Sequence, residues 1–123
     1  MKKKALIILI ILLDLFLLKF NLVIVNGNSM NPTLTNHQVC IMMKTKQIND
    51  GDIIVINTKN IAKIPAKSII KRYKADYSTP QMIYVEGDNK NNSLDSHDFG
   101  LINRHNIIGK VIFVSDVSLT FSH

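Results

Sequence analysis

The chain is divided into short runs of β-branched and aromatic residues separated by turn-forming residues, and this pattern restricts the fold more than any other feature. Turn signals include Asn49-Asp50-Gly51-Asp52 and a long polar segment at 87–100. Beyond residue 34, no segment has the periodicity of an amphipathic helix. We expect strands near residues 22–25, 38–43, 53–56, 68–73, 82–86 and 107–114. The sequence therefore predicts a mainly β domain, a small antiparallel β-barrel or sandwich.

The N-terminus is a candidate transmembrane helix. Residues 5–18 are apolar except for Asp14, and they lie between Lys2-Lys3-Lys4 and Lys19. They would form about 21 Å of helix against a hydrocarbon core of about 30 Å, and Lys19 can snorkel towards the interface. A removable signal peptide is the alternative, but no small-x-small cleavage pattern follows. We favour a cytoplasmic N-terminus and single-pass anchor at residues 1–25, and an extracytoplasmic domain at 26–123. The role of Asp14 stays open.

Charge and cysteine content narrow the classes of partner. The formal net charge is +6, but the positive residues are spread along the chain without a basic helix or aromatic-interleaved patch, which disfavours nucleic acid. The charge suits an anionic membrane surface or simply a solvated one. Cys40 is the only cysteine, so an internal disulfide and a multi-cysteine metal site are excluded. Its apolar neighbours predict a buried structural role. We expect no metal or organic cofactor.

Residues 27–34, Gly-Asn-Ser-Met-Asn-Pro-Thr-Leu, form a candidate nucleophile loop around Ser29. Pro32 fixes its own φ and pushes Asn31 towards an extended conformation, while Gly27 permits backbone geometry denied to other residues. These backbone constraints can fix the direction in which the Ser29 hydroxyl points. A serine flanked by glycine and proline is also found in ordinary turns, so this loop needs a base elsewhere in the chain.

Lys71 is the candidate base. Alternation in the expected strand at 68–73 puts Ile69, Lys71 and Tyr73 on one face, where burial would lower the lysine pKa and leave a neutral amine. The alternative is that Lys71 and Arg72 are an exposed basic pair on an edge strand. The chain has four histidines, and none of them lies in an expected strand that would fix the position of its side chain. They are His37, His97, His105 and His123.

The chain carries four short motifs behind an apolar N-terminus. The first is Ser29-Met30-Asn31-Pro32-Thr33-Leu34, and the second is Gly51-Asp52 followed by the apolar run 53–56. The third is the pair Lys71-Arg72. The fourth is formed by Gly87-Asp88-Asn89, Asn92-Ser93-Leu94-Asp95-Ser96 and Phe99-Gly100. In these motifs and in their order the chain resembles type I signal peptidases, the membrane-anchored serine proteases that remove signal peptides from exported proteins. The four motifs are similar, in turn, to the family's nucleophile motif, its Gly-Asp-hydrophobic strand, its Lys-Arg pair and its last motif.

The resemblance implies a role for each matched residue. Ser29 would be the nucleophile, Lys71 the general base, and Ser93 the hydroxyl that holds the lysine amine. The Ser29 backbone N–H would donate to the oxyanion, and Gly27 occupies the position of a side-chain donor found in some members, so that donor is lacking or replaced. Met30 would pack beside the dyad and keep it dry. A charged network behind the site would support it, formed by Asp88, Arg72 and Asp95.

Three departures from the family pattern matter. His97 stands where the family usually has an arginine, which weakens an ion pair with Asp88 or Asp95. The segment after Arg72 lacks the family's Gly-x-Pro-Gly-Asp turn, and there is no room between Lys71 and Gly87 for the additional β-domain of larger members. The chain is close to a catalytic core alone.

These observations predict a membrane-bound serine endopeptidase that cleaves signal peptides from exported preproteins, with those preproteins and membrane lipid as partners. The alternatives are a LexA-like self-cleaving Ser-Lys protein, which would be cytoplasmic, and a catalytically degenerate relative that binds signal peptides without cutting. The substrates and the oligomeric state are left open by the sequence.

Overall fold

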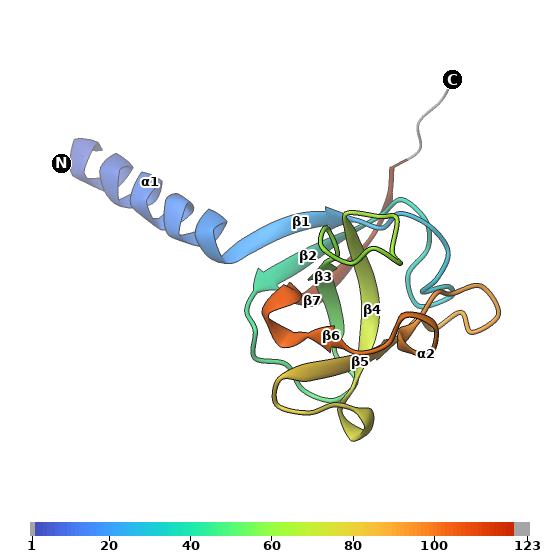
Figure 1. Ribbon diagram of the computed structural model, residues 1–123. Helices are drawn as coiled ribbons and strands as arrows, with labels where there is room; N and C mark the ends of the chain where they lie inside the picture. Colours follow the sequence, from blue (N-terminus) through green and yellow to red (C-terminus); the bar gives the residue numbers. More distant parts are fainter. Residues whose placement is uncertain (1, 120–123) are drawn as a thin grey trace.

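A computed structural model describes residues 2–119, as one N-terminal helix followed by an antiparallel sheet (Figure 1). The main elements are α1 (Lys2–Lys19), β1 (Phe20–Ile24), β2 (Gln38–Lys44), β3 (Ile53–Asn57), β4 (Ser68–Lys74), β5 (Met82–Glu86), α2 (Ser96–Phe99), β6 (Ile102–Asn103) and β7 (Ile107–Ser118). Two short 3₁₀ helices lie between strands, at Ala75–Tyr77 after β4 and at Arg104–Asn106 after β6.

All strand pairs in the sheet are antiparallel, and the strand order is β1-β2-β7-β3-β4-β5-β6. The sheet curls into a half-barrel, so the predicted mainly β fold is confirmed (Figure 1). Curling brings β1, at one end of the strand order, towards β4. Two buried clusters fill the interior. The larger consists of Ile54, Ile56, Ile64, Tyr73, Ile83, Val85, Ile102 and Ile107. The smaller consists of Val25, Met30, Leu34 and Cys40.

The sheet begins earlier in the chain than the predicted domain start at residue 26. Phe20 to Ile24 pair residue by residue with β2, from Phe20 opposite Met43 to Ile24 opposite Val39. The helix α1 ends at Lys19 and projects away from the sheet (Figure 1). It has no buried residue. Among residues 2–119, no helix combines the length and apolar character needed to cross a membrane.

Cys40 lies in the smaller cluster and is fully buried, as its apolar neighbours predicted. Burial raises the pKa of its thiol, which keeps it protonated and unreactive. Its side chain packs in one cluster with Val25, which precedes the nucleophile loop, and with Met30, which lies on it. Cys40 therefore acts as a small apolar core residue against which the nucleophile loop packs.

Candidate active site

Ser29 lies on the loop that joins β1 to β2, and the residues around it are firmly held. Met30 and Leu34 are buried in the smaller cluster, with exposed fractions of 1% and 0%. The Leu34 N–H donates to the Met30 carbonyl over 2.9 Å, and the Asn31 N–H donates to the Asn28 carbonyl over 3.1 Å. Met30 thus anchors the loop in the core while the half-buried Ser29 remains accessible.

A second loop, at residues 87–89, contacts the nucleophile loop directly. The Asn89 N–H donates to the Ser29 carbonyl over 2.8 Å, and the Asn89 side-chain amide donates to the Asn28 carbonyl over 3.0 Å. Gly87 makes this approach possible, because a Cβ there would collide with the Ser93 hydroxyl and the Ser29 carbonyl oxygen. The two sequence motifs are therefore parts of one structure.

Lys71 is buried on β4, with only 4% of its side chain exposed. Its Nζ donates to the Ser93 hydroxyl over 2.7 Å and to Asp95 Oδ1 over 3.3 Å, and the Ser93 hydroxyl donates to the same Asp95 oxygen. Burial lowers the pKa of Lys71, and the Asp95 carboxylate partly opposes this. The interpretation of Lys71 and Arg72 as an exposed basic pair is wrong for Lys71.

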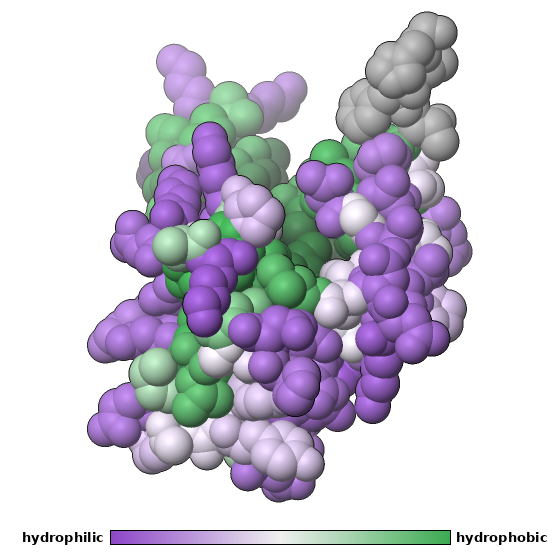
Figure 2. All heavy atoms as spheres, turned by 45° about the vertical axis from the view of Figure 1, so that its right-hand side comes forward, coloured by the Kyte–Doolittle hydropathy of each residue, from purple (hydrophilic) through white to green (hydrophobic). Residues whose placement is uncertain are grey.

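Ser29 and Lys71 together border two adjoining cavities. One has a volume of about 150 Å³ and lies between the end of β1 and the first half of β4; its walls include Val23, Val25, Ala66 and Ile69. The other is a wider cavity of about 500 Å³ beside the loop at 91–94. The loops at 25–37 and 87–95 come forward in Figure 2, where apolar side chains gather in a hollow between polar flanks.

The backbone beside the smaller cavity has unpaired strand edges. Within the described part of the chain, residues 2–119, β5 pairs with β4 only from Arg72 to Lys74, so the first half of β4 pairs with β3 alone. In the same residues, β1 is paired only with β2. An extended peptide between these two edges could form backbone hydrogen bonds with either strand.

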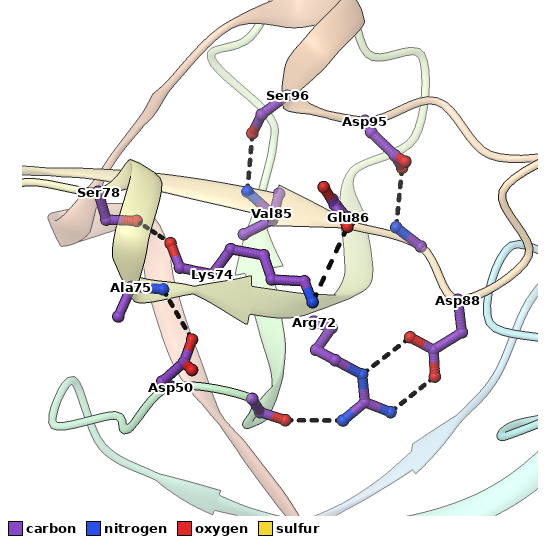
Figure 3. A network of polar contacts seen from close by, with 12 residues as sticks. Asp50, Arg72, Lys74, Ala75, Ser78, Val85, Glu86, Asp88, Asp95 and Ser96 are labelled. Carbon is purple, nitrogen blue, oxygen red and sulfur yellow. Dashed lines mark hydrogen bonds and ion pairs between the residues drawn. The ribbon is translucent and has the colours of Figure 1, made fainter.

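Arg72, the next residue on β4, pairs with Asp88 (Figure 3). Its Nε and one terminal nitrogen donate to the two Asp88 oxygens over 2.8 and 2.6 Å, and the other terminal nitrogen donates to the Gly51 carbonyl over 2.7 Å. Thr33 also donates to Asp88, over 2.6 Å. The Arg72 hydrogen bonds lower the pKa of Asp88, and the same bonds raise the pKa of Arg72. This pair joins β4 to the 87–89 and nucleophile loops.

Asp95 lies apart from that pair, although the sequence grouped the three residues in one network. Its Oδ1 accepts from the Gly87 N–H over 2.9 Å (Figure 3). The same oxygen also accepts from Lys71 and Ser93. Asp95 therefore contacts the candidate base itself. His97 is exposed, and within residues 2–119 it forms no ion pair with Asp88 or Asp95. In the same part of the chain, no three His, Cys, Asp or Glu residues are placed to hold a metal.

Two residues at the site were missed by the sequence analysis. Asn89 holds the nucleophile loop, and its only sequence signal was its place beside Asp88. Asn26 borders both cavities and directly precedes Gly27. An asparagine in a loop does not by itself predict a contact with an active site, because loop asparagines most often form turns.

Comparisons with known proteins show the family of this chain. The family described as "Signal peptidase, peptidase S26" matches residues 1–75 and 74–115. The proteins named "Inactive signal peptidase IA" of Staphylococcus aureus strains MRSA252, Mu50 / ATCC 700699 and N315 are each 29% identical over 147 aligned residues, covering 85% of this chain and 84% of the relative. The family match spans nearly the whole sequence. The chain therefore belongs to the signal peptidase family, peptidase S26.

Proposed function

We propose that this protein is a membrane-bound serine endopeptidase that cleaves signal peptides from exported preproteins, with Ser29 as nucleophile and Lys71 as general base. The observation that carries the proposal is the burial of Lys71 beside the cavities that Ser29 also lines, with its amine held by Ser93 at 2.7 Å. A desolvated lysine of lowered pKa is suited to accept a proton from a serine.

In the proposed reaction, neutral Lys71 takes the proton of the Ser29 hydroxyl as its Oγ attacks the scissile carbonyl carbon. Lys71 then gives that proton to the leaving amine as the C–N bond breaks. Water, deprotonated by the same lysine, hydrolyses the acyl-enzyme. Ser93 and Asp95 orient the amine throughout, and the Arg72–Asp88 pair holds the loops in register.

The smaller cavity supports a substrate with small side chains. The unpaired edges of β1 and β4 would hold the residues before the cut as an added strand, and alternate side chains would point to the cavity floor. A volume of about 150 Å³ suits alanine-sized groups better than large ones. This agrees with the small residues that the family resemblance implies at the first and third positions before the cut.

We further propose that the N-terminal segment anchors the protein, with Lys2, Lys3 and Lys4 in the cytoplasm and the sheet outside. Because α1 alone lacks the length and apolar character of a membrane span, Lys19 at its other end would have to snorkel to the outer interface. The side chains of α1 from Leu6 to Leu18 are apolar except for Asp14, and they are exposed. Lys2, Lys3 and Lys4 suit the cytoplasmic side. Confinement of enzyme and preprotein to one membrane surface would raise their effective concentration.

A second candidate function is capture of signal peptides without cleavage. The names of the Staphylococcus aureus relatives favour it, because they describe those proteins as inactive. The carboxylate of Asp95, 3.3 Å from the Lys71 amine, also favours the protonated lysine. Membership of the signal peptidase family favours both candidates over a LexA-like self-cleaving protein.

Covalent labelling distinguishes the two candidates. We expect a serine-directed acylating inhibitor to add one acyl group to the full-length protein in detergent, and peptide mass mapping to locate it on Ser29. Ser29→Ala should not react, whereas Ser78→Ala, which removes a serine that bonds the Lys74 carbonyl, should react normally. A folded wild-type protein that stays unlabelled would support the binding relative and contradict the peptidase.

A further inference from the structure

The oxyanion site of this chain needs a donor that the sequence motif does not supply. The negative oxygen formed in acyl transfer is usually stabilised by two hydrogen-bond donors. The Ser29 N–H forms no hydrogen bond with residues 2–119 and is available as one of them. Gly27 has no side chain, and its N–H already donates to Asn36 Oδ1 over 2.8 Å. The second donor must come from another residue.

Asn26 is the residue whose position fits this need. Of the described residues, only Asn26, Ser29 and Lys71 line both the smaller and the wider cavity. The scissile bond must lie where the two cavities meet, because the nucleophile and the base both lie there. Asn26 thus borders the same point as the two reacting groups.

The side chain of Asn26 is uncommitted, whereas its backbone is held on both sides. Val25 is buried, and its N–H and carbonyl bond to Gln38 and His37 over 2.9 and 2.7 Å. Gly27 is tied to Asn36. Within residues 2–119, the amide group of Asn26 itself has no hydrogen-bond partner. The Asn26 amide therefore has no internal hydrogen bond to break before it donates to a substrate, and its backbone is fixed. Such a preorganised donor can stabilise a developing negative charge.

We propose that the Asn26 side-chain amide is the second oxyanion donor, replacing the side chain absent at Gly27. The inference rests on the proposed peptidase function. As the Ser29 oxygen bonds to the carbonyl carbon, the π pair of the C=O moves to its oxygen and the hydroxyl proton moves to Lys71. That oxygen accepts hydrogen bonds from the Ser29 N–H and Asn26 Nδ2. The pair returns to re-form the C=O when the C–N bond breaks.

Asn60 is the matched control. It is also an exposed asparagine, in the turn that follows β3, but it lines neither cavity. A substitution of the Asn60 side chain therefore removes an exposed amide of the same kind without changing the nucleophile loop or a group between the two cavities.

The test is the steady-state kinetics of full-length wild type, Asn26→Ala, Asn26→Asp, Asn60→Ala and Asn60→Asp in detergent, with a peptide carrying an Ala-x-Ala site. We expect kcat of both Asn26 variants to fall about 10²- to 10³-fold with KM changed only a few-fold, because the lost bond forms in the transition state. Both Asn60 variants should stay within about threefold of wild type, since surface substitutions away from a site have small effects. The isosteric Asn26→Asp keeps the shape of the side chain, so a parallel loss excludes a folding defect.

Three outcomes would overturn the assignment. They are a kcat near the wild-type value in both Asn26 variants, a loss confined to KM, and an equal loss in the Asn60 variants. The first would leave the peptidase function intact and remove only Asn26. If wild type cleaves no peptide, acylation by a p-nitrophenyl ester passes through the same oxyanion and provides the same comparison. A wild type inert to both reagents would contradict the peptidase function and the assignment together.

Discussion

Lys71→Met is expected to lower kcat/KM for signal-peptide cleavage at least about 10⁴-fold, because a serine without its base is a poor nucleophile. Methionine retains the length of the buried side chain and cannot accept the proton. In the wild-type protein the activity should rise with pH with a midpoint below 10.5, the ordinary lysine pKa, because only the neutral amine reacts and burial favours it. Steady-state kinetics over a range of pH measure both effects.

Lys74→Met is the matched control for this substitution. Lys74 lies on the same strand, but it is 37% exposed and forms only a 4.0 Å ion pair with Glu86. The control should retain activity within a few-fold, since exposed pairs contribute little. An active Lys71→Met protein, or an equal loss in both variants, would exclude Lys71 as the base.

Gly87→Ala should lower kcat/KM at least about 10²-fold, since displacement of a catalytic group by about 1 Å can cost that much. A Cβ at this position would meet the Ser93 hydroxyl and the Ser29 carbonyl oxygen, so both the lysine-holding group and the nucleophile loop must shift. The free energy of unfolding should fall by about 1–3 kcal/mol, as in other overpacked sites. Urea unfolding and peptide cleavage provide the two readouts.

Lys90→Ala provides the comparison for Gly87→Ala. Lys90 is exposed on the same loop and makes no ion pair with residues 2–119. It should match wild type in both measurements. Full activity in Gly87→Ala would mean that the two loops can separate without affecting Ser29. It would contradict the conclusion that the contact of residues 87–89 with the nucleophile loop holds Ser29 in place.

Local patterning predicted most of the sheet. The strand β5 has the predicted bounds, because its apolar alternation is clear and turns flank it. β6 was missed because its pairing joins only Ile102 and Asn103 to β5. β7 continues to Ser118, past the predicted end at residue 114, although Ser115 and Asp116 break its apolar run. Pairing with β2, as far as Gln38 opposite Ser118, overrides that local signal.

The site was less predictable than the strands. Alternation along β4 correctly separated Lys71 from Arg72, and the motif order identified Ser93 as the partner of the lysine. Which carboxylate pairs with which cation could not be read from the sequence, because Asp88 and Asp95 follow the same strand in one polar loop. Their division between Arg72 and Lys71 depends on how that loop folds over Gly87.

The most direct test of the account is cleavage of a preprotein with an Ala-x-Ala site by the detergent-purified full-length protein, with the product N-terminus sequenced. We expect a single cut directly after the second alanine, absent in Ser29→Ala and retained in the control Ser78→Ala. A cut at another position, or one that persists in Ser29→Ala, would contradict the assignment of Ser29 as the nucleophile of a signal peptidase.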